Sequence, residues 1–141
     1  MNKRIVKSPK LYFYDTGLLC HLLGIKNTVA LKKNNAYGAL FENWAISEIR
    51  KNNFNAGQNE GMYYFRDNVG NEVDLITEKN EEPLAIEIKA AVKVNSSSLK
   101  GLQFWQKYQA KSHAVLLHGG NTNEIVNDRM GIVPWTEVIN L

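Results

Sequence analysis

Gly-Asn-Glu-Val-Asp-Leu-Ile at residues 70–76, followed after a polar turn by Ile-Glu-Ile-Lys at residues 86–89, is the part of the sequence that decides the fold. Side chains alternate between the two faces of a strand, so Glu87 and Lys89 should share one face of the second segment, opposite the two isoleucines. Taken alone, such a pair is readily explained as a solvent-facing ion pair on a half-exposed sheet. A second observation is needed before it indicates a functional site.

The first segment supplies that observation in Asp74. Alternation should put Asp74 and Ile76 on one face of the strand, and Val73 and Leu75 on the other. A hairpin between the two segments would bring Asp74 near Glu87. Two carboxylates at that range repel each other unless a cation lies between them, and Mg²⁺ or Mn²⁺ binds such oxygen ligands readily. We therefore expect a metal-binding pair, with two carboxylates that simply point to water as the alternative.

Hydrophobic spacing places helices and further strands around these segments. The elements expected are a helix over 37–51 ended by Asn52-Asn53, strands over 62–66, 72–77 and 84–90, a helix over 99–108, a strand over 114–117, and a strand with a loop near 130–135. The first three strands should form an antiparallel meander, and the helical crossover should make the fourth parallel to the third. The fold class is α/β, an αβββαβ core over residues 37–141 with a mixed sheet flanked by helices.

Residues 1–36 should form an N-terminal extension to this core. The aromatic run at residues 10–15 predicts a strand, and residues 16–23 predict a short helix that Asp15 or Thr16 can cap. The polar stretch before it resembles the exit from an upstream region, so we expect Met1 to begin a fragment of a longer protein.

Glu42 is a third candidate acid, on the helix expected over 37–51. Its neighbours at the helical spacings are Ala45, Ile46 and Ile49, so Glu42 should border the buried face. A single helical glutamate usually faces solvent. Its position directly before the meander is what favours a functional role.

The order Glu42 on a helix, Asp74 on a strand and Glu87-Ile88-Lys89 on the next strand resembles the PD-(D/E)xK nuclease superfamily, in particular its Holliday-junction-resolvase-like members. The resemblance implies a restriction-endonuclease-like fold and hydrolysis of DNA phosphodiester bonds with Mg²⁺ or Mn²⁺. Asp74 and Glu87 would bind the metal, joined by the backbone carbonyl of Ile88 and, directly or through water, by Glu42. Lys89 would orient or activate the attacking water or stabilise the phosphate. A lysine beside two carboxylates stays protonated unless desolvation wins, so we favour stabilisation.

Three further side chains are candidates for contact with nucleic acid, namely Arg66, Lys100 and Gln103. Gln106 could approach the site from the same helix as Gln103. The ordinary alternative for Lys100 is that it simply lies on a solvated helix face. Tyr63 and Tyr64, which precede Arg66, could also touch nucleic acid, although packing on the sheet is their ordinary role.

A second resemblance extends the first towards the N-terminus. Residues 7–18, with Gly38-Ala39-Leu40-Phe41-Glu42-Asn43 and Tyr64-Phe65-Arg66, look like the C-terminal domain of bacterial and archaeal AAA-type ATPases. It implies a covalently linked upstream ATPase region, although the sequence holds no Gly-x-x-x-x-Gly-Lys phosphate loop. The expected function is a nuclease domain of such an ATPase. The alternative is a catalytically silent module that binds DNA or protein and regulates the ATPase.

Composition sets the outer bounds. The chain has 141 residues, 44% of them hydrophobic, which suits one domain. Its formal charge of +3 permits a nucleic-acid partner without requiring one. The lone Cys20 excludes an intrachain disulfide and a cysteine-based zinc cluster, and no apolar run approaches the length of a membrane span, so we expect a cytoplasmic protein.

Overall fold

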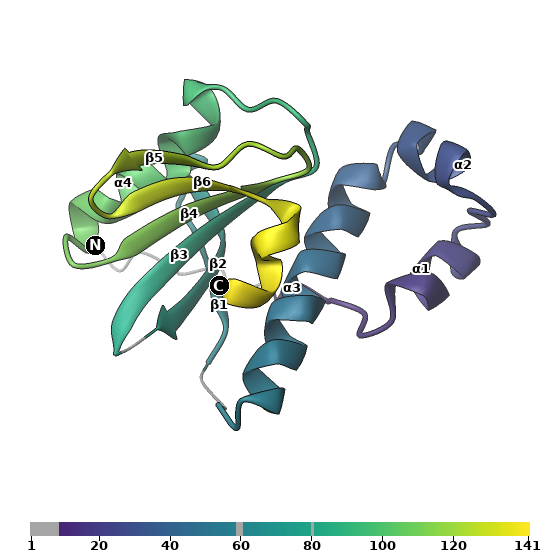
Figure 1. The fold of residues 1–141 in the computed structure, drawn as a ribbon, viewed down its shortest axis with the longest axis horizontal. Coiled ribbons are helices and arrows are strands. Elements are labelled where there is room, and N and C mark those ends of the chain that lie inside the picture. Colours follow the sequence, from purple (N-terminus) through teal and green to yellow (C-terminus); the bar gives the residue numbers. More distant parts are fainter. Residues whose placement is uncertain (1–8, 59–60, 80) are drawn as a thin grey trace.

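The chain builds a mixed α/β structure around a six-stranded sheet, in a computed structural model that describes residues 9–58, 61–79 and 81–141 (Figure 1). The elements are, in chain order, α1 (Thr16–Leu22), α2 (Thr28–Lys33), α3 (Tyr37–Asn55), β1 (Tyr63–Arg66), β2 (Glu72–Lys79), β3 (Glu82–Lys89), the 3₁₀ turn η1 (Ser96–Leu99), α4 (Lys100–Tyr108), β4 (His113–His118), β5 (Glu124–Asn127), β6 (Met130–Pro134) and the 3₁₀ segment η2 (Trp135–Asn140).

The sheet has the strand order β1-β2-β3-β4-β6-β5. The pairs β1–β2, β2–β3 and β5–β6 are antiparallel, whereas β3–β4 and β4–β6 are parallel. The expected meander and the parallel crossover through α4 are therefore confirmed, as is the α/β class. The sequence did not indicate β5, because all four of its residues are exposed and show no apolar alternation.

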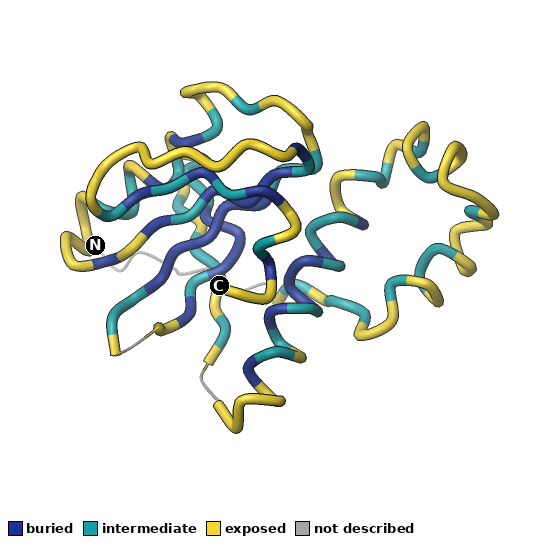
Figure 2. The backbone as a smooth tube through the Cα atoms, viewed as in Figure 1, coloured by how far each residue is buried: buried dark blue, intermediate teal, exposed yellow. Residues whose placement is uncertain are grey.

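Two apolar layers hold the sheet between α3 and α4 (Figure 2). On the α3 side, Ile46 and Ile49 pack with Ile86 and Ile88 of β3. On the α4 side, the fully buried Leu102 packs against the sheet; the other buried members of that layer are Val73, Ala85, Leu99, Ala114, Leu116, Met130 and Ile132. The two strand acids, Asp74 and Glu87, are both buried in this part of the sheet.

Helix α3 is longer than predicted. It continues through Asn52 and the buried Asn53 to Asn55. Gly57 lies two residues beyond the end of the helix, and its φ of 72° is in the left-handed region that favours glycine. The amide N–H of Gln58 donates back to the Asn53 carbonyl at 2.8 Å, which closes the last turn. The prediction that Asn52-Asn53 would end this helix is therefore wrong.

The N-terminal part differs from the expectation in two respects. Residues 28–33, where no helix was expected, form α2. The predicted strand over residues 10–15 is not formed, and this segment lies against α3 without joining the sheet. The Asp15 side chain accepts from the Leu18 N–H at 2.9 Å, which confirms it as the cap of α1. Helices α1 and α2 contain no buried residue.

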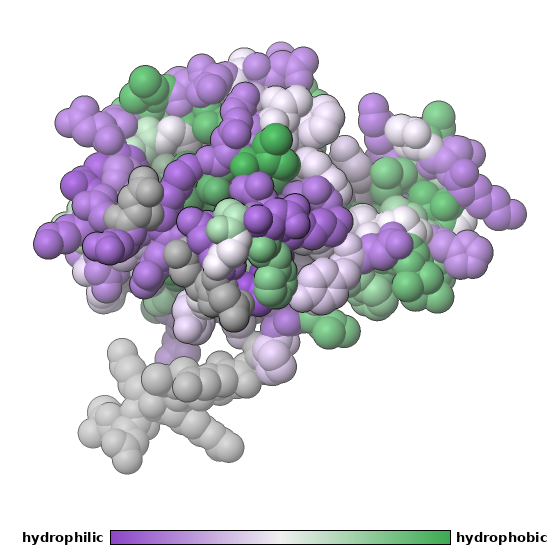
Figure 3. Space-filling view, turned by 60° about the horizontal axis from the view of Figure 1, so that its bottom comes forward, coloured by the Kyte–Doolittle hydropathy of each residue, from purple (hydrophilic) through white to green (hydrophobic). Residues whose placement is uncertain are grey.

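Several apolar side chains are exposed on this part of the protein, at Leu18, Leu22, Leu23 and Val29, and hydrophobic surface gathers there at the right of Figure 3. None of the helices within the described ranges combines the length and the apolar character that crossing a lipid bilayer requires.

Candidate functional site

Asp74 lies on an irregular stretch of β2. Tyr63 of β1 faces Ile76 and Phe65 faces Val73, so β2 has one residue more than β1 between these pairs, which is the arrangement of a β-bulge. At the same point the Asp74 carboxylate accepts the backbone N–H of Ile88 on β3 at 2.9 Å. The side chain of Asp74 thus takes a hydrogen bond at the place where the regular β2–β3 pairing has ended.

The bulge corrects the predicted division of β2 into two faces. Val73 and Ile76 pack on the α4 side of the sheet, whereas Leu75 packs on the α3 side. Val73 and Leu75 therefore do not share a face, contrary to the prediction. Simple alternation along the sequence cannot reveal a bulge of this kind. Asp74 itself is only 8% exposed.

Glu87 and Lys89 form the second part of the site, on β3. The Lys89 ammonium is 2.5 Å from Glu87 Oε1, and Glu87 is 8% exposed. Glu87 Oε2 is buried and has no hydrogen-bond partner within the described residues. A buried carboxylate oxygen without a partner costs free energy, and such an orphan in a native site calls for an explanation.

Helix α4 approaches the carboxylate at Gly101. A Cβ atom added there would lie 2.1 Å from the Glu72 carbonyl oxygen and 3.7 Å from Glu87 Oε2. Only glycine permits this separation, so the start of α4 closes directly over the unpartnered oxygen.

Burial and charge raise the pKa values of both strand acids. Burial, followed by the charge of Asp74, raises the pKa of Glu87 to about 7. Burial also raises the pKa of Asp74, although the Ile88 N–H works against it. Burial opposes the charge on Lys89, but the hydrogen bond and charge of Glu87 outweigh burial and raise the lysine pKa. Lys89 is therefore a permanent cation at neutral pH.

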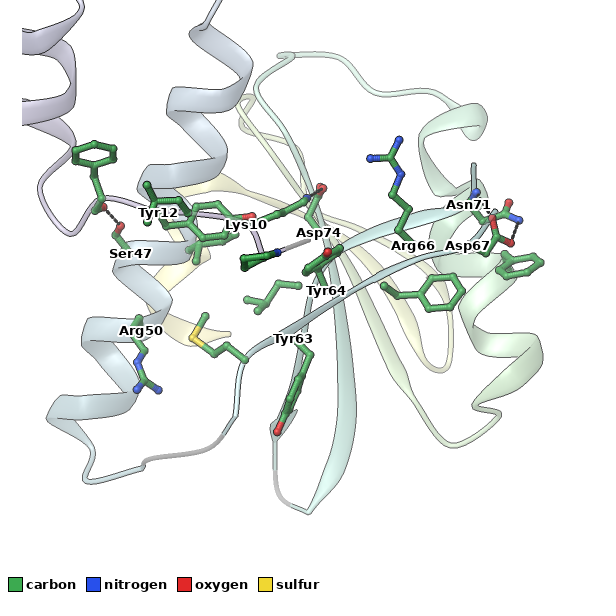
Figure 4. Close-up of a pocket in the computed structure, with 18 of the residues that line it drawn as sticks. Lys10, Tyr12, Ser47, Arg50, Tyr63, Tyr64, Arg66, Asp67, Asn71 and Asp74 are labelled. Carbon is green, nitrogen blue, oxygen red and sulfur yellow. Dashed lines mark hydrogen bonds and ion pairs between the residues drawn. The ribbon is translucent and has the colours of Figure 1, made fainter. Parts of the chain in front are cut away.

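A second lysine, which the sequence did not single out, lies among the acids. The Lys10 ammonium is 2.8 Å from Glu72 Oε1 and 3.3 Å from Glu42 Oε1. It is also 3.6 Å from Asp74 Oδ1, and Figure 4 shows these two residues side by side. The ammonium lies 5.3 Å from the centre of the Tyr64 ring. Burial opposes its charge, but the hydrogen bond to Glu72 and the nearby carboxylates outweigh burial and raise its pKa. The amine of Lys10 thus neutralises the side of the site that faces α3.

Polar side chains of α3 hold the segment that carries Lys10. The Asn43 amide accepts the Phe13 N–H at 2.7 Å and donates to the Phe13 carbonyl at 2.9 Å. The Ser47 hydroxyl donates to that same carbonyl at 2.8 Å. Tyr12 donates its hydroxyl proton to Glu42 Oε1 at 2.7 Å. Asn43 and Ser47 are one helical turn apart and buried, and that spacing was the available sequence signal for this contact.

The structure brings the predicted acids together unevenly. Glu42 and Lys89 are close enough to Asp74 to affect its pKa, and Asp74 and Lys89 are close enough to Glu87 to affect its pKa. Asp74 contacts the N–H of Ile88, the residue whose carbonyl was the predicted ligand. Within the described ranges, no three His, Cys, Asp or Glu side chains form a ready metal-binding group.

The predicted nucleic-acid contacts lie further out. Arg66 lies at the rim, 3.9 Å from Glu72 Oε2. Lys100 and Gln103 are exposed on α4 and, in the part of the chain that the structure describes, bond to none of the site acids. Gln106 instead donates to the backbone carbonyls of Ser112 and Arg129, so its role is structural.

A groove of about 1640 Å³ opens beside Asp74. The N-terminal segment at residues 9–14, α3, β1 with the turn that follows it, and the end of α4 line its walls. Figure 4 shows Lys10, Tyr12 and Tyr64 gathered near Asp74, with Arg50 and Arg66 at opposite ends. The site is therefore open to a large ligand from the β1 side.

Comparison with known proteins identifies a family for this chain, and the names of the matching proteins and domains state no activity. No solved structure matches the chain significantly. It is 36% identical over 89 residues to "Uncharacterized protein Rv2008c" of Mycobacterium tuberculosis and to "Uncharacterized protein Mb2031c" of Mycobacterium bovis, covering 63% of this chain and 19% of each relative. The chain thus spans about a fifth of the length of these curated relatives.

Two family models match different parts of the sequence. Residues 1–29 match a domain of unknown function designated DUF8612. Residues 37–138, which include every residue of the expected αβββαβ core except the last three, match a domain of unknown function designated DUF4143. The chain belongs to the DUF4143 family.

Proposed function

We propose that this protein is a nuclease domain of the restriction-endonuclease type, which hydrolyses DNA phosphodiester bonds with Mg²⁺ or Mn²⁺. The observation that carries the proposal is the pair of buried acids Asp74 and Glu87, which lie where the regular β2–β3 pairing ends. Lys89 lies beside Glu87, and within the described residues Glu87 Oε2 has no hydrogen-bond partner. Asp74 lines the groove, and acids with perturbed pKa values beside a cation and a groove are a usual mark of a site of chemistry.

The donor set fits a hard divalent cation. Glu87 Oε2 and Asp74 would bind it through oxygen, together with the Ile88 carbonyl, while Glu42 would act through water. When bound, such an ion lowers the pKa of a bound water and neutralises charge that builds on the phosphate. It would also relieve the two costs of the present arrangement, the repulsion between the acids and the unpartnered oxygen.

The residues of the chain supply the remaining chemistry. Lys89 keeps its proton at neutral pH and can stabilise the negative charge of the phosphate at the transition state. Loss of such a group costs about 3 kcal/mol, by analogy with a lost oxyanion donor. Gly101 keeps the approach of α4 close to the acids, so that water is excluded from one side of the site.

Cleavage assays test the proposal directly. We expect Mg²⁺- or Mn²⁺-dependent cleavage of at least one of supercoiled, linear, single-stranded and branched DNA, and loss of cleavage in Asp74→Asn and Lys89→Ala. Glu124→Gln, which changes an exposed acid on β5, should cleave normally. Absence of cleavage with every substrate and both metals would refute the enzyme, and cleavage that survives both site substitutions would identify a contaminant.

Lys10 favours a second candidate, a catalytically silent module that binds DNA or protein and regulates an ATPase. Its ammonium already supplies positive charge to Asp74, Glu42 and Glu72, as a metal would. Mg²⁺ titration by calorimetry separates the two candidates. A nuclease should bind Mg²⁺ with Lys10 in place, and Lys10→Met should tighten this binding. A silent module should bind Mg²⁺ only in Lys10→Met.

The proposed setting is the cytoplasm, with this domain as the C-terminal module of an AAA-type ATPase. The resemblance of residues 7–18 and 38–43 to that class supports the setting. ATPase activity in the longer natural protein, together with its recovery in the cytosolic fraction, would test it.

A further inference from the structure

The groove beside Asp74 has walls of an unusual composition. Aromatic residues line it from end to end, namely Tyr12, Phe13, Tyr14, Tyr63, Tyr64, Phe65, Phe104 and Tyr108. Within the described ranges, three of the five exposed aromatic side chains of the protein lie here, with Tyr14 64%, Tyr63 68% and Tyr108 71% exposed. Large exposed aromatic surface that gathers in one concave place is a mark of a binding site.

Some of these rings pack against one another. Phe104 stacks on Phe65 with 6.0 Å between ring centres, and Tyr108 packs on Phe104 at 5.1 Å. The backbone of Gly61 lies beside the exposed ring of Tyr63. A ring that is already packed, as that of Tyr108 is, offers its open face to a ligand at a smaller cost in conformational entropy.

The charge of the groove is small. Three cations line it, Lys10, Arg50 and Arg66, against the acids Asp67 and Asp74. Asp67 is engaged by its own turn, where it accepts from the Val69 and Asn71 amides at 2.9 and 2.8 Å. A duplex-binding protein draws on many more phosphate contacts, typically about 6 to 10. Aromatic walls with few cations instead match the stacking platforms that take unpaired bases.

We infer that this groove takes an unpaired nucleic-acid strand, whose bases stack on the exposed tyrosines while its backbone runs past Asp74. The inference deepens the proposed function, on which it rests, by naming the substrate class as a single strand or a frayed end. Arg66 at one end and Arg50, which lies over the Phe54 ring at 4.2 Å, at the other would meet phosphates on either side of the site.

Binding measured without turnover tests the inference. We would follow the fluorescence anisotropy of labelled oligothymidine, oligouridine and a hairpin duplex of equal length, with the whole chain in EDTA. A single strand should bind at least about tenfold more tightly than the duplex, and Tyr63→Ala and Tyr108→Ala should each weaken binding about tenfold, the loss of one stacked base. Tyr63→Phe and Tyr108→Phe should bind normally. With Arg50 and Arg66 as the two phosphate contacts, the logarithm of affinity should fall with the logarithm of salt concentration with a slope of about −1.4.

The matched control is Tyr37→Ala, since Tyr37 begins α3 and does not line the groove. It should leave binding unchanged. The two single strands together separate DNA from RNA as the source of the shared chemistry, and tight binding of either supports the inference. Duplex binding as tight as that of the single strand, alanine variants that bind normally, or no binding to any oligonucleotide would overturn it.

The two proposals fail differently. Tight single-strand binding without cleavage in Mg²⁺ would refute the proposed nuclease activity and support single-strand binding in the groove. Cleavage of duplex DNA by a protein whose tyrosine variants behave as the wild type would refute single-strand binding in the groove and support the nuclease activity.

Discussion

Glu87 should make the stability of the protein depend on pH in a direction opposite to that of an ordinary paired acid. Its pKa rises from 4.5 to about 7 on folding, first because it is buried and second because Asp74 is close. Between these values the folded protein holds a proton that the unfolded chain has released. The free energy of unfolding therefore falls as pH rises from 4.5 to about 7.

The size of the effect follows from the shift. One pKa unit corresponds to about 1.36 kcal/mol, so a shift from 4.5 to about 7 amounts to about 3 kcal/mol. The raised pKa of Asp74 adds to the fall, whereas the hydrogen bond from Lys10 lowers the pKa of Glu72 and acts against it. The wild-type curve alone therefore mixes several acids, and Glu87→Gln, which mimics the protonated acid and does not titrate, isolates one.

Urea unfolding of the wild type and Glu87→Gln in EDTA, at a series of pH values, measures the difference. We expect the wild type and Glu87→Gln to have equal free energies of unfolding at about pH 4. At about pH 8 the free energy of unfolding of Glu87→Gln should be higher by about 3 kcal/mol. Glu124→Gln, which removes an exposed charge on β5, should run parallel to the wild type. If the curves of the wild type and Glu87→Gln are also parallel, Glu87 is not held in a costly ionised form, and the electrostatic account of the site fails.

Two further changes test the packing that builds the site. Asn43→Ala removes two hydrogen bonds to the Phe13 backbone, so it should cost about 2 kcal/mol in urea unfolding and expose residues 9–15 to limited proteolysis. Gly101→Ala should cost about 1–3 kcal/mol because its Cβ would meet the Glu72 carbonyl. Its control, Gly38→Ala, has open space around it in α3 and should instead stabilise by about 0.5–1 kcal/mol; equal effects of the two alanines would contradict the close approach.

Much of the sheet was predictable because its strands keep a regular period. In β3, Ile86 and Ile88 pack towards α3 while Glu87 takes the other face, as alternation requires. Strand β3 pairs continuously with β4 through six residue pairs, so nothing interrupts the period. The parallel crossover followed from the helix between these strands for the same reason, since short apolar segments joined by a helix have few ways to pair.

The two features that shape the site were not predictable by this reasoning. The bulge at Asp74 adds one residue to β2, and an extra residue leaves the local pattern looking regular while it exchanges the faces on either side. Lys10 reaches Glu42 across 32 positions of sequence, and no local period reports a contact of that separation. Sequence order placed the acids and Lys89 on the right elements, and only the tertiary structure showed that Lys10 lies beside Glu42 and Asp74.

The position of Lys10 also ties the N-terminal segment to the chemistry of the site. The Asp74 carboxylate is stabilised by the Ile88 N–H and by the charges of Lys89 and Lys10, so release of the N-terminal segment from α3 would remove one of the two nearby cations from this buried acid. A divalent ion at Asp74 would in turn weaken the hold on Lys10. Because coupling of this kind is reciprocal, the proposed metal binding would loosen the segment by the same free energy with which release of the segment would tighten metal binding. On this proposal the N-terminal segment and the two acids Asp74 and Glu87 form one thermodynamic unit, coupled through Lys10.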